Sequence, residues 1–228
     1  MTHLLSFLVM ILRLQASRSA TGISLKSQEL FFLVFATRYL DLFTHYVSLY
    51  NTTMKLLYLG LSGAIVYYIR FKEPFKSSYD KSIDSFLHWK FAVLPCAILA
   101  LIFHERLEVM EILWTFSLYL EAVAIIPQLI LLQRHGEVEN LTSNYVVLLG
   151  IYRAFYLINW IYRAATETHY HTIWPMFIAG LVQTGLYVDF FYYYAVRFVA
   201  IAYFPPISLT SSTFLSSKYS GKKMTLPS

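Results

Sequence analysis

The stretch Tyr145-Val-Val-Leu-Leu-Gly-Ile-Tyr-Arg-Ala-Phe-Tyr-Leu-Ile-Asn-Trp-Ile-Tyr-Arg163 decides the class of this protein, because it is an apolar helical pattern interrupted by polar groups. Tyr152, Tyr156, Asn159 and Arg163 recur at i, i+4, i+7 and i+11, which places them along one face of a helix. A charged side chain inside a bilayer is energetically costly, so such groups usually pair with one another or line a wet cavity. The stretch therefore predicts a membrane helix with a polar face toward the interior of a bundle.

The preceding apolar segment, residues 111–128, carries ionisable groups in the same way. It begins with Glu111, has Glu121 near its middle and closes at Pro127-Gln128. Its carboxylates are complementary to Arg153 and Arg163 of the following segment. We predict that the two segments share one polar cavity.

The composition is typical of a membrane protein. Of the 228 residues, 57% are hydrophobic and only 14% are charged, and the mean hydropathy is +0.53. Soluble domains have roughly a quarter of their residues charged. The net charge of +5 comes mainly from basic residues in expected loops and the tail, where such residues set membrane topology. The lone Cys96 excludes an intramolecular disulfide.

We expect an all-α membrane protein with seven transmembrane helices. The predicted spans are residues 3–14, 29–50, 54–69, 91–103, 111–128, 145–163 and 174–197. The third span is nearly uncharged, and we assign it no chemistry. Excess Lys and Arg in the 70–90 connection places that loop in the cytosol, which makes the N-terminus lumenal and the C-terminus cytosolic. Residues 1–198 would form the membrane domain and residues 199–228 a cytosolic tail.

The second span carries Arg38 and Asp41 near its middle. Residues three apart can pair on one helix face, which would make these two a structural ion pair. The other interpretation is that Arg38 awaits an anionic ligand. The residues alone leave both interpretations open.

Several sequence segments are distinctive when taken together. They include Arg38-Tyr-Leu-Asp-Leu-Phe-Thr44, Val47-Ser-Leu-Tyr-Asn51, Ile112-Leu-Trp-Thr-Phe-Ser117, Tyr119-Leu-Glu-Ala-Val-Ala-Ile-Ile-Pro-Gln128, Asn159-Trp-Ile-Tyr-Arg163, Gly180-Leu-Val-Gln-Thr184 and Asp189-Phe-Phe-Tyr192. These segments resemble the KDEL receptor family, also called ER lumen protein-retaining receptors. The resemblance covers residues 3–197 and the extreme C-terminus. The sequences of residues 119–132 and 140–152 are most similar to the plant branch of that family.

The resemblance implies a fold similar to the PQ-loop sugar transporters, with two three-helix repeats joined by a linking helix. Pro127-Gln128 and Val182-Gln183 at matching helix ends agree with such a repeat. The implied function is binding of the C-terminal Lys-Asp-Glu-Leu or His-Asp-Glu-Leu tetrapeptide of escaped ER lumenal proteins in the Golgi. The receptor would then return these lumenal proteins to the endoplasmic reticulum in COPI-coated vesicles. The tetrapeptide is a signal read by a receptor and does not anchor a protein in the membrane.

By family position, five residues would hold the negative charges of the tetrapeptide. Arg38 and Tyr39 would take its terminal carboxylate, and Asn159, Trp160 and Arg163 its acidic side chains. Guanidinium groups suit this role because their planar fork donates two parallel hydrogen bonds to a carboxylate. Without the family, the arginines are equally well explained as structural ion pairs, and the aromatic residues as packing or as an interfacial belt.

The remaining ligand-binding positions implied by the resemblance are partly acidic. Asp41 and Glu111 would face the cationic first residue of the tetrapeptide. Arg153 and Tyr156 would complete the polar interior.

The resemblance further implies a pH sensor made of His3, Glu121 and Tyr152. Histidine suits this task because its unperturbed pKa of about 6.5 lies between the mildly acidic Golgi and the near-neutral endoplasmic reticulum. On sequence alone, His3 would be an ordinary exposed terminal residue.

Three residues are implied in recycling: Asp189, Lys222 and Lys223. The C-terminal Lys222-Lys-Met-Thr-Leu-Pro-Ser228 is similar to the return signal that the COPI coat reads in the family. The simpler interpretations are positive-inside charge for the lysines and a packing hydrogen bond for Asp189.

The chain departs from the family pattern in three places. Members usually begin several residues earlier, with an arginine that helps to hold the ligand, so we expect a shortened first span. Residues 199–217 look like an insertion before the tail. His45 stands where the family often has another polar residue, so ligand preference is expected to shift.

Two other functions remain open at this point. A small-solute transporter could use the same fold and cavity, although Arg38, Arg153 and Arg163 favour an anionic ligand over a neutral sugar. An inactive splice product is the other alternative. No nucleophile with a base, metal-ligand cluster or phosphate-binding loop is apparent, so we expect no enzyme and no cofactor. The expected partners are lumenal peptides, the COPI coat and membrane lipid, and no nucleic acid.

Overall fold

The computed structural model describes residues 2–135, 137–167, 174–203 and 223–225, and this part of the chain is almost entirely helical. The first half contains α1 (Thr2–Ser17), α2 (Leu25–Arg38), the 3-10 helix η1 (Leu40–Phe43), α3 (Leu49–Phe71), α4 (Phe75–Ser78), the π-helical turn η2 (Trp89–Val93) and α5 (Leu94–Ile102). The second half contains α6 (Val109–Val123), α7 (Ile126–His135), β1 (Glu137–Glu139), α8 (Asn140–Thr166), α9 (Trp174–Tyr203) and β2 (Lys223–Thr225), with β1 and β2 antiparallel.

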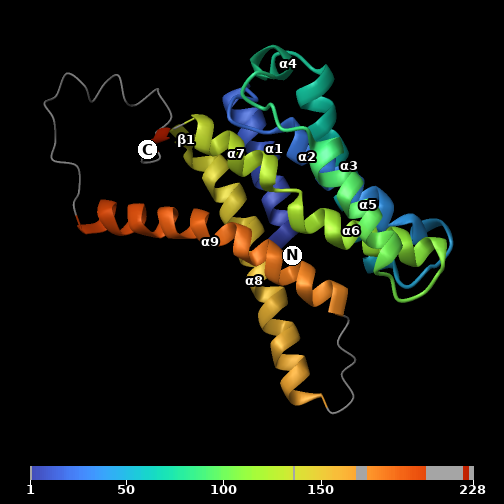
Figure 1. Cartoon of the computed structure of the whole chain (residues 1–228). Coiled ribbons are helices and arrows are strands. Elements are labelled where there is room, and N and C mark those ends of the chain that lie inside the picture. The colour runs from blue at the N-terminus through green and yellow to red at the C-terminus, as the bar shows by residue number, and fades with distance from the viewer. Residues whose placement is uncertain (1, 136, 168–173, 204–222, 226–228) are drawn as a thin grey trace, which may run out of the picture.

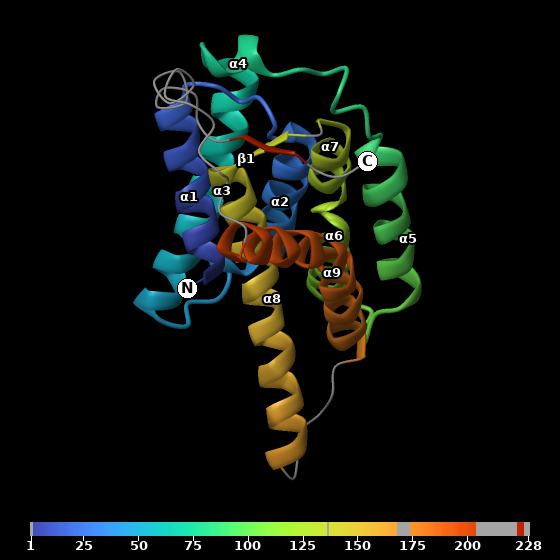
Figure 2. The same ribbon diagram turned by 90° about the vertical axis from the view of Figure 1, so that its left-hand side faces the viewer.

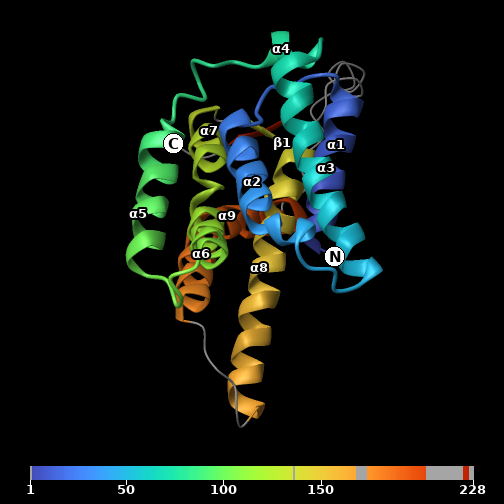
Figure 3. The same cartoon turned by 90° about the vertical axis from the view of Figure 1, so that its right-hand side faces the viewer.

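The main helices form a bundle with two distinct ends. Figure 1 shows α4 at one end of the bundle, together with the α1–α2 connection. The C-terminal half of α8 projects past the opposite end, as Figure 2 and Figure 3 show from two sides. Within the bundle, α8 packs against α1 and α9, while α6 packs against α2, α5 and α9.

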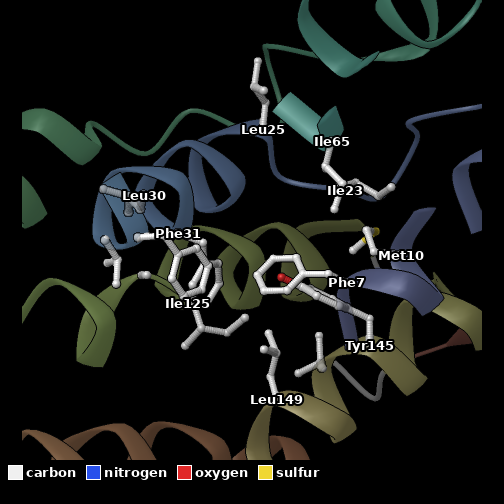
Figure 4. Packing of buried hydrophobic residues seen from close by; sticks show 14 of the residues in the cluster. Phe7, Met10, Ile23, Leu25, Leu30, Phe31, Ile65, Ile125, Tyr145 and Leu149 are labelled. Carbon is white, nitrogen blue, oxygen red and sulfur yellow. The ribbon is translucent and has the colours of Figure 1, made fainter. Parts of the chain in front are cut away.

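A core of large apolar side chains joins α1, α2 and α8. Phe7 and Met10 from α1 lie beside Tyr145 and Leu149 from α8, with Phe31 from α2 close by (Figure 4). All five side chains are fully buried. Because lipid tails are as apolar as these side chains, close packing rather than the hydrophobic effect supplies most of the attraction between helices in a bilayer.

Polar contacts join the loops at the α4 end. The Asp84 carboxylate is 2% exposed and accepts hydrogen bonds from Ser24 Oγ at 3.0 Å and Tyr79 Oη at 2.8 Å. Burial and this hydrogen bond to Asp84 raise the pKa of Tyr79 well above its usual value. Ser24 also donates its backbone N–H to Gln128 Oε1 at 2.8 Å. The start of α2, the 79–88 loop and the start of α7 are therefore held together.

Several predicted helix ends are wrong. The second span was expected to reach residue 50, but α2 ends at Arg38 and the chain turns through η1. Arg38 forms an ion pair with Glu121 on α6, and Asp41 forms one with Lys55 on α3. These two ion pairs accompany the change of chain direction after Arg38. The fifth span was expected to close at Pro127-Gln128, but α6 ends at Val123 and Pro127 lies in the first turn of α7, where its missing N–H costs no helical hydrogen bond.

Two other spans differ in a simpler way. The fourth begins before residue 91 with the π-helical turn η2, which precedes Pro95 in the first turn of α5. The seventh does not end at residue 197, because α9 continues to Tyr203 and crosses the expected start of the tail.

Two helical stretches among the described residues are long and apolar enough to cross a membrane, Val109–Leu132 and Asn144–Thr166. Thr2–Ser17, Trp89–Ile102 and Met176–Val188 are apolar but shorter. The helical character of the chain agrees with the predicted class. The count of seven spans and the internal repeat stay predictions.

Candidate functional site and family membership

Two arginines share one buried carboxylate near the middle of the bundle. Arg38 Nη1, at the end of α2, lies 2.6 Å from Glu121 Oε2 on α6. Arg153 Nη1, on α8, lies 3.9 Å from Glu121 Oε1. Glu121 is 2% exposed and Arg153 is 4% exposed. Two guanidinium groups against one carboxylate leave this cluster with a formal excess of one positive charge.

The arginines of this cluster keep unused hydrogen-bond donors. Arg38 Nη2, Arg153 Nε and Arg153 Nη2 are buried and have no hydrogen-bond partner among the described residues. A buried donor without a partner costs about 1–3 kcal/mol, and more when the group is charged. Such a set of donors suits a carboxylate, which accepts parallel N–H bonds from a guanidinium fork.

Neutral side chains hold the cluster in place. Tyr152 Oη donates to Glu121 Oε1 at 2.6 Å, and Gln183 Nε2 on α9 donates to Tyr152 Oη at 3.3 Å. Arg38 Nε donates to Ser117 Oγ at 3.0 Å, one turn before Glu121 on α6. Four helices thus converge on one ionic centre.

His3 lies directly beside this centre. Its imidazole stacks on the Tyr152 ring with the centroids 4.0 Å apart and the planes 5° from parallel. His3 is 8% exposed, and its Nε2 has no hydrogen-bond partner among the described residues. Tyr152 therefore links the imidazole to the Glu121 carboxylate. The structure brings together His3, Glu121 and Tyr152, while their role in pH sensing stays a prediction.

Asp41 does not pair with Arg38. Its Oδ2 instead lies 2.6 Å from Lys55 Nζ on α3, because η1 turns Asp41 away from the face of α2 that carries Arg38. Tyr39, which caps α2, stacks on Phe35 with the ring centroids 5.8 Å apart. The interpretation of Arg38 and Asp41 as an ion pair is therefore wrong.

The polar residues of α8 run outward from the buried cluster. Tyr152 is buried, whereas Tyr156, Asn159 and Arg163 are exposed on the projecting part of the helix. Arg163 donates to both carboxylate oxygens of Glu167, at 2.9 and 3.0 Å. These hydrogen bonds from Arg163 lower the pKa of Glu167.

Trp160 contacts residues from both the buried and the exposed part of α8. The Arg153 guanidinium carbon lies 5.7 Å from the centroid of the Trp160 ring. The centroid of the Tyr156 ring lies 5.9 Å from the same Trp160 centroid. Trp160 itself packs against α9 at Gly180, where an added Cβ would come within 2.5 Å of the indole. A glycine at this position lets the indole approach the backbone.

The remaining predicted site residues lie elsewhere. Glu111 is partly buried in the first turn of α6, about three turns before Glu121. Asp189 belongs to α9, but its side chain lies outside the described part, as does Lys222. Lys223 lies in β2 opposite Glu139. No group of three or more His, Cys, Asp and Glu side chains in the described ranges could hold a metal ion.

Sequence reasoning missed three residues of this region: Lys55, Ser117 and Gln183. Lys55 is the ion-pair partner of Asp41, so the assignment of no chemistry to the third span is wrong. A single lysine inside an apolar helix was the available signal. Ser117 gave no such signal, because uncharged polar residues are common in membrane helices. Gln183 was noted only as part of the predicted repeat and not as a residue of this cluster.

Comparison with known proteins gives the family. The sequence profile described as "ER lumen protein retaining receptor" matches residues 19–163, which is more than half of the chain. The chain belongs to this family. An ER lumen protein-retaining receptor of Petunia hybrida is 57% identical over 194 residues, covering 85% of this chain and 89% of the relative. Receptor B of Arabidopsis thaliana matches with the same identity and coverage. The receptor of Drosophila melanogaster is 52% identical over 197 residues, covering 86% of this chain and 91% of the relative.

These matches confirm the resemblance inferred from the sequence, and plant proteins are among the similar relatives. The family is one of receptors and not of enzymes, in agreement with the expectation for this chain. Family membership also establishes the coarse class, a helical membrane receptor.

Proposed function

We propose that this chain is a receptor for the C-terminal tetrapeptide Lys-Asp-Glu-Leu or His-Asp-Glu-Leu of escaped ER lumenal proteins. The observation that carries the proposal is the pair of Arg38, which is partly buried, and Arg153, which is buried; they share Glu121 and keep buried donor atoms without partners. The tetrapeptide supplies one terminal carboxylate and two acidic side chains. An anionic ligand would offset the excess positive charge and use the unpaired N–H groups.

The ligand would lie along the path from Arg38 to the outer part of α8. Arg38 and Tyr39 would hold its terminal carboxylate at the inner end. Asn159, Trp160 and Arg163 would hold its acidic side chains further out. This order is supported by burial, because Glu121 and Arg153 are buried, whereas Asn159 and Arg163 on the outer part of α8 are exposed.

The other inner residues would complete the site. Asp41 and Glu111 would face the cationic first residue of the ligand. Arg153 and Tyr156 would line the passage between the two anion-binding groups, since both lie against Trp160.

Binding would depend on pH through His3. Because two arginines share one carboxylate, the free cluster carries excess positive charge, and a proton on the imidazole would be stabilised by the negative charge that the bound ligand adds. The acidic Golgi would therefore favour the bound state. Release would follow in the near-neutral endoplasmic reticulum. The stacked geometry of His3 on Tyr152 supports this assignment.

The receptor would be a multi-pass protein of the ER and Golgi membranes, with seven helices and PQ-loop repeats. Basic residues lie near the 79–88 loop at the α4 end of the bundle. The Lys26 backbone N–H donates to Asp84 Oδ2 at 3.3 Å, and Arg134 Nη1 donates to the Ile83 carbonyl at 3.3 Å. The positive-inside bias would place this end in the cytosol. The N-terminus lies toward the other end, which would be lumenal (Figure 2).

Return to the endoplasmic reticulum would use the cytosolic tail. Lys222 and Lys223 would present the signal that the COPI coat reads, with Asp189 taking part in recycling.

The experiment that tests the proposal is equilibrium binding of a labelled Lys-Asp-Glu-Leu peptide to membranes that carry the full chain. Arg153→Met should reduce the affinity at least about tenfold, since it removes charged hydrogen bonds worth about 1.5–3 kcal/mol. Arg18→Met, an exposed arginine in the α1–α2 connection, is the matched control and should leave the affinity unchanged. Saturable binding that is equal in all three proteins would refute the assigned site.

A further inference from the structure

The ion pair between Lys55 and Asp41 bears directly on how the proposed receptor selects its ligand. Lys55 Nζ lies 2.6 Å from Asp41 Oδ2 and 6.0 Å from the Tyr39 ring centroid. The Lys55 side chain is 9% exposed, whereas the Asp41 side chain is 45% exposed. The lysine therefore comes from within the bundle, whereas the Asp41 side chain is partly exposed but has its Oδ1 atom buried.

The pair leaves Asp41 with capacity for one more donor. Its Oδ1 has no hydrogen-bond partner within the described residues. A second ammonium group could bind there, but the carboxylate is already neutralised by Lys55. A neutral ion pair attracts a further cation much less than a bare carboxylate does, and the incoming cation is repelled by Lys55.

We infer that Lys55 is a specificity-determining residue that competes with the ligand's cation for Asp41. This inference rests on the proposed function, in which Asp41 faces the first residue of the tetrapeptide. Lys55 lowers the contribution of that residue to binding. It thereby allows lysine and histidine at the first position to be accepted with similar affinity, because neither gains the full attraction of a free carboxylate.

The inference makes a prediction about a ratio of affinities. For each receptor variant, the affinity for Lys-Asp-Glu-Leu is divided by the affinity for Ala-Asp-Glu-Leu, which has no cation at its first residue. In Lys55→Met the ratio should rise by up to about fivefold, the range of partly exposed ion pairs. A purely structural role for Lys55 would change both affinities together and leave the ratio unchanged.

Three further variants make the experiment specific. Lys55→Arg keeps the charge and should keep the wild-type ratio. Lys55→Gln removes the charge but can still donate a hydrogen bond to Asp41, so it should raise the ratio even if the methionine variant does not fold. Lys72→Met removes a lysine at the other end of α3 and should have no effect.

The outcomes are distinguishable. Peptide binding by the wild type, with a ratio in the folded neutral variants that is unchanged or lower, would overturn the inference and leave the proposed function standing. A wild-type chain that binds neither peptide would overturn the proposed function and the inference with it.

Discussion

Arg38 Nη1 and Glu121 Oε2 lie 2.6 Å apart and join the end of α2 to α6. Glu121 also accepts the Tyr152 hydroxyl and lies near Arg153, so one carboxylate organises contacts from three helices. Because Glu121 is the negative charge that both arginines share, its removal should destabilise the folded protein.

Glu121→Gln should lower the free energy of unfolding by about 3–5 kcal/mol, because the buried Arg153 and the partly buried Arg38 lose their counter-charge. Thermal unfolding of the purified protein in detergent measures the effect. Tyr152→Phe leaves the charges in place but removes the hydrogen bond to Glu121 and the one accepted from Gln183, and it should cost about 0.5–3 kcal/mol. Equal stability of Glu121→Gln and the wild type would show that the cluster is not an ionic centre.

Arg163→Lys should weaken tetrapeptide binding by about tenfold, because a point ammonium cannot reproduce two parallel hydrogen bonds to a carboxylate. In the free protein the Arg163 fork is held by Glu167. Glu167→Gln should therefore keep the affinity or raise it by up to about fivefold, since less of the fork must be released. Unchanged peptide affinity in well-folded Arg163→Lys protein would remove Arg163 from the site.

His3→Ala should flatten the rise in peptide affinity between about pH 7 and about pH 5.5. The bound state holds the extra proton, so wild-type affinity is greatest at low pH and is lost as the pH rises. Titrating peptide binding across this range in both proteins measures the effect. A full pH dependence in the alanine variant would place the proton elsewhere, with Glu111 or Glu121 as the next candidates.

The pair of Arg163 and Glu167 should not contribute to that pH dependence. Hydrogen bonds from Arg163 lower the pKa of Glu167 below its ordinary value. A carboxylate with a lowered pKa stays ionised above its unperturbed value of about 4.3, and its contribution is lost only as the pH falls further. Glu167→Gln should thus keep the pH profile of the wild type.

Replacing both Lys222 and Lys223 by serine should leave the receptor in the Golgi with peptide binding intact. The expected cause is loss of the lysines that the vesicle coat reads. Imaging of the tagged receptor after addition of ligand measures its return, and Lys218→Ser serves as the control. Continued cycling of the double variant to the endoplasmic reticulum would contradict the assignment.

The sequence predicted the location of most helices, because long apolar runs leave few alternatives in a membrane protein. It did not predict where α2 stops. Residues 39–43 are as apolar as the helix before them, and the break depends on contacts of Arg38 with Glu121 and of Asp41 with Lys55. Tertiary partners of this kind are invisible to periodicity, which describes one helix at a time.

The candidate site, like the helices, could be predicted only in part. Family resemblance gave His3, Glu121 and Tyr152, and the structure places them together. Helical spacing correctly put Tyr152 and Arg163 on one helix, but it did not reveal that one is buried and the other lies on a projecting end. That difference depends on how far the neighbouring helices extend, which spacing within α8 does not encode.

The central claim is that this chain recognises a free C-terminal carboxylate together with acidic side chains. The most direct measurement compares binding of Lys-Asp-Glu-Leu and of the same peptide with an amidated C-terminus, at about pH 6, where an unperturbed imidazole is largely protonated. The amide removes one charged contact to Arg38, so its affinity should be at least about tenfold lower. Equal affinities of the acid and the amide for the folded wild-type protein would contradict the account.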